Sequence, residues 1–267
     1  MTCEVGFLGF GRMAQAISEG LNKSGKMPYS RQAASALRTD KLQSLADTRG
    51  FVVAVDNRNL LSLSPAVIIA VKPHQVQNAL AKAGPAVRGQ LFISIAAGIS
   101  LAELQAWLPD GTRVIRVIPN LPAQVGRGLT LVCAPEGTRP DDLKLTRYIF
   151  ESVGTVTELP ESLFDEGTAV SGSGPAYFFL VMEAMVRGAV RLGLPWDLAK
   201  KMVLQTARGA AETALVKDDL SLADLRDQVT SPGGTTAEAL YVLEQGGLTA
   251  LFQEALEAAS VKAKKLK

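Results

Sequence analysis

Three small residues near the start of the chain, Gly9, Gly11 and Ala14, have types and spacing that suit ligand chemistry. They match the pattern G-x-G-x-x-A, with a short apolar segment before it and helical spacing after it. The first glycine permits a tight turn, the second lets a pyrophosphate approach the backbone, and the alanine lets helix and strand pack closely. The following helix N-terminus offers free N–H groups and a partial positive charge. These residues predict a dinucleotide-binding turn rather than a glycine-rich surface turn.

Two further stretches place hydroxyl side chains and flexible backbone in front of an expected helix. Residues 171–177 read Ser-Gly-Ser-Gly-Pro-Ala-Tyr, and residues 230–236 read Thr-Ser-Pro-Gly-Gly-Thr-Thr. We expect both to be loops that present hydroxyls and N–H groups at a helix N-terminus, which suits a small carboxylate. The alternative for each stretch is a helix cap with close backbone packing.

The end of the second expected strand, residues 32–37, is where a dinucleotide fold selects its cofactor. An acidic residue there would bind the adenine ribose hydroxyls, but the sequence offers Ser35, Arg38 and Thr39. A cation with hydroxyls suits a 2′-phosphate, so NADPH is favoured and NADH is the alternative. Arg38 could instead be an ordinary surface arginine. Thr39 and Asp40 are expected to cap the helix that follows.

The composition excludes several classes of function. His74 is the single histidine, so histidine-based metal sites and Ser-His-Asp catalysis are not expected. The formal net charge is +2, and the only basic block is the tail at residues 262–267, expected to be a solvated helix end, so nucleic acid is not an expected partner. Cys3 and Cys133 have no metal-ligand spacing and are expected to be free thiols. No apolar run of about 18 residues is expected, so a cytoplasmic protein is the default.

The elements that must position these residues follow an alternating pattern up to about residue 160. Apolar segments expected to be strands are residues 5–8, 32–37, 51–54, 66–71, 91–95, 113–118, 128–133 and 155–158. Helical spacing separates several of them, including residues 75–82 and 141–152. Strands alternating with helices predict an open parallel sheet whose ligand lies at the carboxyl ends of the strands. Residues 1–160 are therefore expected to form a Rossmann-type, doubly wound α/β domain.

Longer helical periods follow and predict an all-helical domain over residues 161–267. The expected helices are residues 175–192, 195–216, 222–228, 235–245 and 248–265. Apolar stretches at residues 177–182 and 240–243 exceed what one small bundle can cover. We therefore expect a second copy of the chain to bury part of this surface, giving a homodimer.

The four motifs together resemble pyrroline-5-carboxylate reductase. They are residues 9–14, the Ala-Val-Lys-Pro at residues 70–73, residues 171–177, and the Ser-Pro-Gly-Gly-Thr-Thr at residues 231–236, in the family's order and spacing. The resemblance implies reduction of the cyclic imine 1-pyrroline-5-carboxylate to L-proline with NAD(P)H, the last step of proline biosynthesis. It also implies interleaved helical domains, with residues 231–236 of one subunit facing the cofactor of its mate.

The resemblance also assigns site residues. Those implied to bind the cofactor are Leu8, Gly9, Phe10, Gly11, Arg12 and Met13 at the pyrophosphate, Ser35, Arg38 and Asn57 at the adenosine end, and Ala70, Val71, Lys72, Pro73, Ala96, Ala97 and Gly98 at the nicotinamide half. Those implied to bind the substrate are Glu161, Ser231, Gly233, Gly234, Thr235 and Thr236. Thr236 is expected near the imine nitrogen. Lys72 is expected either to set the electrostatics of the cleft or to be structural, and His74 to be a helix-start residue.

Two other functions fit a two-domain dinucleotide-binding plan. A β-hydroxyacid dehydrogenase would need a catalytic lysine after its glycines, but this sequence has Phe178 in that position and Met182 where that family has asparagine. Alcohol oxidation without that lysine is implausible. A non-catalytic NADPH sensor has little need for two additional anion-binding loops.

Overall fold

The computed structural model describes residues 3–265, which fall into two compact units. The first unit extends to Ser173 and also includes the chain from Ala259 onward, and the second is Gly174–Ala258. The end of the chain belongs to the first unit because Glu166 accepts a hydrogen bond from Ser260 (3.4 Å) and pairs with Lys264 (2.6 Å). The boundary that we expect after residue 160, between the dinucleotide-binding domain and the helical domain, remains a prediction.

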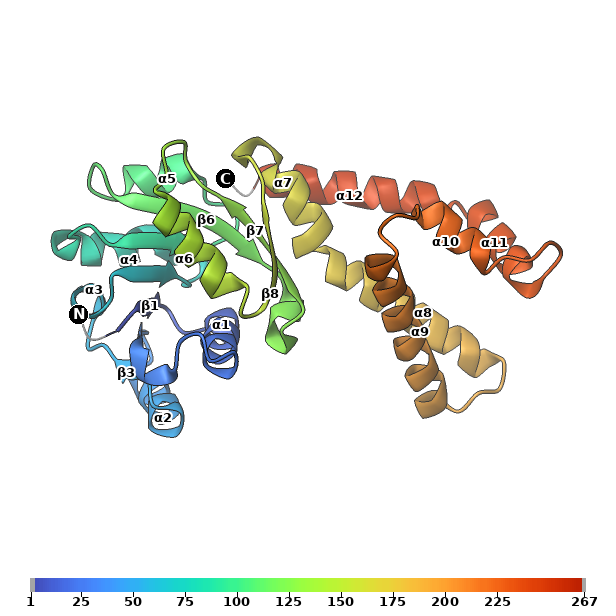
Figure 1. Ribbon diagram of the computed structural model, residues 1–267, viewed down its shortest axis with the longest axis horizontal. Coiled ribbons are helices and arrows are strands. Elements are labelled where there is room, and N and C mark those ends of the chain that lie inside the picture. Colours follow the sequence, from blue (N-terminus) through green and yellow to red (C-terminus); the bar gives the residue numbers. More distant parts are fainter. Residues whose placement is uncertain (1–2, 266–267) are drawn as a thin grey trace. The chain divides into compact units, whose positions relative to one another are not determined.

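The first unit is built on one eight-stranded sheet (Figure 1). Its order is β3-β2-β1-β4-β5-β6-β7-β8, with bounds β1 Val5–Leu8, β2 Gln32–Ser35, β3 Val52–Val53, β4 Ala66–Ile69, β5 Leu91–Ser94, β6 Arg113–Pro119, β7 Gly128–Cys133 and β8 Gly154–Glu158. The strands are parallel except that β6 and β7 are antiparallel. Residues 120–127, which include the 3₁₀ turn η4 (Leu121–Val125), are too few for the crossover that parallel pairing requires. The expected parallel sheet is therefore corrected at this pair.

Helices cover both faces of this sheet. One face packs α1 (Arg12–Lys23), α2 (Thr39–Arg49) and α6 (Pro140–Phe150), and the other packs α3 (Asn57–Leu63), α4 (Val76–Ala83), α5 (Leu101–Ala106) and α7 (Phe164–Gly167). Every residue of β1, β2, β4 and β5 is buried, as expected for strands covered on both sides. The short turns are η1 (Tyr29–Arg31), η2 (Pro73–Gln75), η3 (Gly84–Ala86) and η5 (Glu161–Leu163). This arrangement is the expected doubly wound fold.

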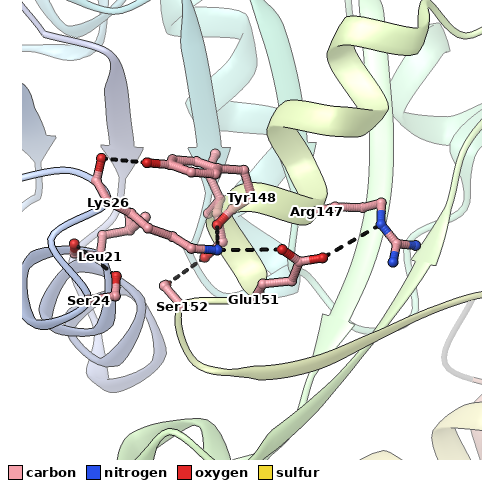
Figure 2. Close-up of polar contacts among 8 residues, drawn as sticks. Leu21, Ser24, Lys26, Arg147, Tyr148, Glu151 and Ser152 are labelled. Atoms are coloured by element: carbon pink, nitrogen blue, oxygen red, sulfur yellow. Dashed lines mark hydrogen bonds and ion pairs between the residues drawn. The ribbon is translucent and has the colours of Figure 1, made fainter.

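Lys26, in the segment that follows α1, is tied to the end of α6 by a cluster of polar contacts (Figure 2). Lys26 Nζ donates to the carbonyl of Tyr148 at 3.0 Å and lies 3.5 Å from Glu151 Oε2. The Tyr148 hydroxyl donates back to the carbonyl of Lys26 at 2.8 Å, and the Lys26 ammonium lies over the Tyr148 ring. Because α1 carries the glycine-rich turn at its other end, these contacts help to fix the helix on which that turn depends.

Residues 171–174 are helical rather than a loop. A π-helical turn, η6 (Thr168–Gly172), leads directly into α8 (Gly174–Arg191), and the N–H of Ser173 donates to the carbonyl of Thr168 at 3.0 Å. The anion-binding loop expected here is therefore wrong, because the helix on its N-terminal side uses the N–H groups. It also makes Glu161–Arg191 one continuous helix, long and apolar enough by length and composition to span a membrane, which corrects the expectation that no such run exists.

The second unit has very little core of its own. Its helices are α8, α9 (Trp196–Val216), α10 (Leu222–Gln228), α11 (Thr235–Gln245) and the larger part of α12 (Leu248–Lys264). Its buried cluster consists of Val186, Ala199 and Val203, and α10, α11 and α12 bury no residue. Residues 266–267 of the expected basic helix end lie outside the described residues.

Large apolar side chains are exposed along this unit. They include Phe178, Phe179, Leu180, Met185, Trp196, Met202, Tyr241, Val242 and Leu251. A helical unit with a three-residue core and this much exposed apolar surface needs another surface to cover it.

Candidate functional site

The turn after β1 requires a glycine at position 9. Gly9 has φ +93°, and a Cβ placed there would lie 2.7 Å from Val71 Cγ1 and 2.8 Å from the Val71 nitrogen. The Gly9 N–H donates to the Ser35 carbonyl at 2.8 Å, and the Ala70 N–H donates to the Leu8 carbonyl at 2.8 Å. The structure thereby brings together the predicted residues that follow β1, β2 and β4 at one edge of the sheet.

The N-terminus of α1 is open above this turn. Gly11 is the N-cap residue, is exposed and has ordinary extended backbone, with φ −75°, and no side chain caps the helix. A Cβ added at Gly11 meets nothing within 4 Å. Ala14 is buried against the core, as its role in close packing requires. Free N–H groups beneath open space suit a pyrophosphate, and the space that a Gly11 Cβ would take is not filled by protein.

Phe10 takes part in this turn through its backbone. Its side chain is buried, with its ring centroid 5.6 Å from that of Phe7 and 4.7 Å from that of Phe51. Met13 is half-buried against the same core, and Arg12 is exposed. Among these three predicted cofactor residues, only Arg12 therefore has a side chain that is free to extend over a bound anion.

A cavity of about 530 Å³ lies beside the ends of β1, β2 and β3. Four predicted residues line it, Leu8, Ser35, Asn57 and Val71. The Ser35 hydroxyl donates to Asn57 Oδ1 at 3.0 Å, and Asn57 Nδ2 donates to the Ala79 carbonyl at 3.1 Å. Asn57 is thus held with its side chain at the cavity wall, and the volume falls in the range of small-molecule sites.

Several lining residues were missed by the sequence reasoning. They are Ala36, Leu37, Ala54, Val55, Asp56, Arg58, Gln75, Asn78, Ala79 and Lys82, together with Thr39, which was considered only as part of the turn. Arg58 and Lys82 add cationic side chains to the cavity lining, and Arg58 Nε donates to the Lys82 carbonyl at 3.3 Å. Arg58 directly follows Asn57 and could have been found from that position, whereas Lys82 has no local signal.

Arg38 rather than Thr39 or Asp40 occupies the cap position of α2. The helix begins at Thr39, the N-cap is Arg38, and no side chain caps the helix, so the expected capping role is wrong. Arg38 is exposed, and its neighbours Leu37 and Thr39 both line the cavity. The position next to the cavity suits contact with an anionic group on the ligand.

The residues predicted for the nicotinamide half follow β4 and β5. Ala70 comes directly after β4, and the N–H of Ile95 donates to the Ile69 carbonyl at 3.1 Å, so residues 96–98 lie beside it. Ala97 is exposed, and Gly98 has φ +76°. Lys72 and His74 are exposed at η2, where Pro73 begins the turn. The last of these, His74, is thus a helix-start residue in the structure, as expected.

Glu161 is held by the protein at one of its carboxylate oxygens. Oε1 accepts the N–H of Leu101 at 2.8 Å and Nη1 of Arg116 at 2.9 Å. Arg116 was missed by the sequence reasoning, although an arginine inside the apolar strand at residues 113–118 was a visible signal. Burial raises the pKa of the neighbouring Cys133 thiol, and the Glu161 carboxylate raises it further. Cys133 is therefore held as a neutral thiol.

The loop at residues 231–236 opens onto the N-terminus of α11 in the second unit. The N–H of Gly234 donates to the Ser231 carbonyl at 3.0 Å, with Pro232 and Gly233 between them and φ +67° at Gly233, as in a type II turn. Gly234 is the N-cap residue, and no side chain caps the helix. Ser231 and Thr235 are exposed and Thr236 is half-buried. This loop has the open N–H groups and hydroxyls expected of a carboxylate site.

Within residues 3–265, no group of three or more His, Cys, Asp or Glu side chains is placed to hold a metal ion. The cavity, the open N-terminus of α1 and the glycine turn fit a dinucleotide with a charged adenosine end. The donors at α11 fit a small anion.

Comparisons with known proteins agree with this chemistry. Residues 161–266 match the family model described as pyrroline-5-carboxylate reductase dimerisation, and residues 4–98 match the model described as NADP oxidoreductase coenzyme F420-dependent. The chain is 39% identical to pyrroline-5-carboxylate reductase 3 of Macaca fascicularis over 266 residues, covering 99% of this chain and 96% of the relative.

Two solved structures are similar over nearly the whole chain. One is a pyrroline-5-carboxylate reductase from Coxiella burnetii, with TM-score 0.92, 37% identity and coverage of 100% of this chain and 99% of that one. The other is pyrroline carboxylate reductase from Plasmodium falciparum with NADP bound, with TM-score 0.89, 30% identity and coverage of 99% and 98%.

Proposed function

The chain belongs to the pyrroline-5-carboxylate reductase family, and from this premise we propose the roles of its residues in the reaction. The enzyme reduces 1-pyrroline-5-carboxylate to L-proline with NAD(P)H, the last step of proline biosynthesis. The observation that carries the residue assignment is the open N-terminus of α1, where a Cβ on Gly11 would meet no protein atom within 4 Å.

The cofactor is proposed to lie along the carboxyl edge of the sheet. Backbone N–H groups of residues 10–13 would hold the pyrophosphate, and the cavity lined by Ser35 and Asn57 would hold the adenosine end. Arg38, beside that cavity, would bind the 2′-phosphate, which supports NADPH as the preferred cofactor. Residues 70–73 and 96–98 would flank the nicotinamide, which supplies the hydride when bound.

The substrate carboxylate is proposed to bind at the N-terminus of α11. The uncapped N–H groups after Gly234 and the hydroxyls of Ser231 and Thr235 are the donors that such an anion needs. The Thr236 hydroxyl would lie near the imine nitrogen, and Lys72 and Glu161 would complete the charge around the substrate. A protonated cyclic imine is already electrophilic, so position and charge complementarity matter more than a strong acid or base.

The chain forms a homodimer, and residues 161–266 match the family's dimerisation model. The exposed apolar side chains of α8, α9 and α11 supply the surface that a second copy would cover. We extend this to an active site that needs both chains, with residues 231–236 of one subunit serving the cofactor of the other. Assembly of dimers into a higher homo-oligomer is part of the same proposal.

The location proposed is the cytoplasm, and the partners are small molecules rather than nucleic acid or membranes. Cys133 is a free, buried thiol, as suits a reducing compartment. The apolar helix Glu161–Arg191 lies entirely within the residues that match the dimerisation model, so protein contacts would account for its composition.

The activity is tested by following NADPH absorbance with 1-pyrroline-5-carboxylate and, as a control, NADP⁺ reduction with 3-hydroxyacids. Turnover of the imine alone is expected. Oxidation of a 3-hydroxyacid, or binding of NADPH without turnover, would contradict the function.

The shared site is tested with two nearly inactive variants. One carries Gly11→Val, and the other carries Thr236→Ala with Ser231→Trp. After the two are unfolded and refolded together, each mixed dimer would have one intact site, so random pairing returns about a quarter of full activity. No recovery, with mixed dimers confirmed by mass, would show that each subunit holds a complete site of its own.

A further inference from the structure

A charged side chain is buried in the middle of β6, and the proposed chemistry gives it no role. Arg116 is 1% exposed, and its guanidinium lies over the Phe164 ring, 4.6 Å from the ring centroid. Nη1 donates to Glu161 Oε1 at 2.9 Å, whereas Nε has no hydrogen-bond partner within the part of the chain that is described. A buried guanidinium with an unsatisfied donor costs free energy, so stability alone does not explain its presence.

Glu161 links Arg116 to the start of α5. The oxygen that accepts from Arg116 also accepts the N–H of Leu101, the first residue of α5, at 2.8 Å. This N–H is one of those that a helix leaves unpaired at its N-terminus, where a carboxylate is also favoured by the helix dipole. Ser100 and Glu103 close the same helix start with a capping box. The beginning of α5 is therefore fixed from both the sheet and the helix.

The segment thus held is residues 95–100, which connect β5 to α5. At its other end, Ile95 is bonded to β4, and the N–H of Ala96 donates to the Ser94 hydroxyl at 3.3 Å. In a dinucleotide fold the ligand crosses the carboxyl edge where the strand order reverses, here between β1 and β4. The adenosine cavity lies on the β2 and β3 side. The nicotinamide half therefore falls on the β4 and β5 side, along this segment.

We propose that Arg116 is a positioning residue for hydride transfer. By holding Glu161 Oε1, it fixes the start of α5 and so the backbone of residues 96–98 against the nicotinamide ring. This inference rests on the proposed placement of the nicotinamide along residues 96–98. It assigns to the Arg116–Glu161 pair the orientation of the reacting half of the cofactor, and no part in binding the adenosine half.

The test compares Arg116→Met with the unmutated dimer for two ligands and for turnover. The ligands are NADPH and 2′,5′-ADP, which carries the adenosine phosphates but no nicotinamide. We expect kcat to fall about 10- to 100-fold, because small misplacements of reacting groups cost this much. NADPH affinity is expected to weaken, whereas the affinity for 2′,5′-ADP stays unchanged. A folded variant that keeps kcat, or that loses affinity for both ligands equally, overturns the proposal.

Further variants keep the result interpretable. Arg116→Lys should have a higher kcat than Arg116→Met, and Glu161→Gln should have a lower kcat than the unmutated enzyme. The double variant Arg116→Met/Glu161→Gln should lose no more kcat than the more impaired of its two single variants. If Arg116→Met does not fold, these two single variants decide by the same measurements. The matched control is Arg113→Met, at the first residue of the same strand, where the Arg113 side chain pairs with Asp142 of α6 and donates to the Gly89 carbonyl. It should leave kcat and both affinities unchanged, and an equal loss of kcat in this control would attribute the effect to general damage of β6.

A separate variant tests whether residues 96–98 face the nicotinamide. Ala97→Trp adds a large side chain at an exposed position of the segment and should block NADPH while sparing 2′,5′-ADP. Normal NADPH binding by this variant would show that residues 96–98 do not face the nicotinamide, whatever the result for Arg116.

Discussion

Replacing Gly11 by valine should separate ligand binding from folding. A Cβ at this position meets nothing within 4 Å, so the added side chain clashes with a ligand and with no described part of the protein. Gly11 is the N-cap residue of α1, and exchanging it for a poor capping residue costs about 1 kcal/mol or less. Exclusion of the pyrophosphate should remove about two charge-assisted hydrogen bonds, roughly 3–6 kcal/mol, which corresponds to a loss of NADPH affinity of about 100- to 20,000-fold.

Gly9→Ala is the matched control, two residues earlier in the same turn. Its methyl group would lie 2.7 Å from Val71 Cγ1 and 2.8 Å from the Val71 nitrogen, on a backbone with φ +93°. The left-handed backbone costs about 1–2 kcal/mol and overpacking about 1–3 kcal/mol. We therefore expect the stability of the ligand-free protein to fall by about 2–5 kcal/mol in this variant.

Titration calorimetry with NADPH and thermal unfolding of the ligand-free protein measure the two effects. Gly11→Val should keep its Tm within about 3 °C of the unmutated protein, whereas Gly9→Ala should lower it by about 5 °C or more. The reasoning is refuted if Gly11→Val binds NADPH normally. It is equally refuted if both variants lose stability to the same extent.

Three further outcomes can be measured. Arg38→Ala should weaken the affinity for NADPH by about 10- to 100-fold, through loss of a charge-assisted phosphate contact, and leave the affinity for NADH nearly unchanged. Kinetic constants for both cofactors measure this, and equal constants for NADPH and NADH in the unmutated enzyme would contradict it. Asn57→Ala breaks the links to Ser35 and Ala79 and should weaken both cofactors about tenfold; a selective loss of NADPH would mean that Asn57 contacts the phosphate instead. Because burial raises the pKa of the Cys133 thiol, a thiol reagent at pH 8 should modify it only after unfolding; rapid labelling of the native protein at that residue would argue against its burial.

The sequence could predict the parts of the site that depend on neighbours along the chain. The glycine turn is confirmed at Gly9 by its positive φ and close contacts, and α10 and α11 have the bounds that the helical spacing predicted. Strand positions were also predicted within a few residues, because burial on both faces demands continuous apolar runs. These features are local: a turn, a cap or a hydrophobic period is determined by residues within a few positions of one another.

Features that depend on distant residues were decided by the tertiary structure. Arg58 and Lys82 line the cavity beside β1, β2 and β3 because the start of α3 lies next to the end of α4, which no local pattern records. The antiparallel pairing of β6 with β7 and the helical conformation of residues 171–174 overrode the expected parallel sheet and loop.

Arg116 and Glu161 show the physical reason most directly. They are 45 residues apart in the sequence, and each alone reads as an arginine in a strand and a surface carboxylate. Their charges are compensated only where β6, η5 and the start of α5 meet. A buried charge requires a partner within hydrogen-bond distance, and the identity of that partner is fixed by packing rather than by sequence spacing.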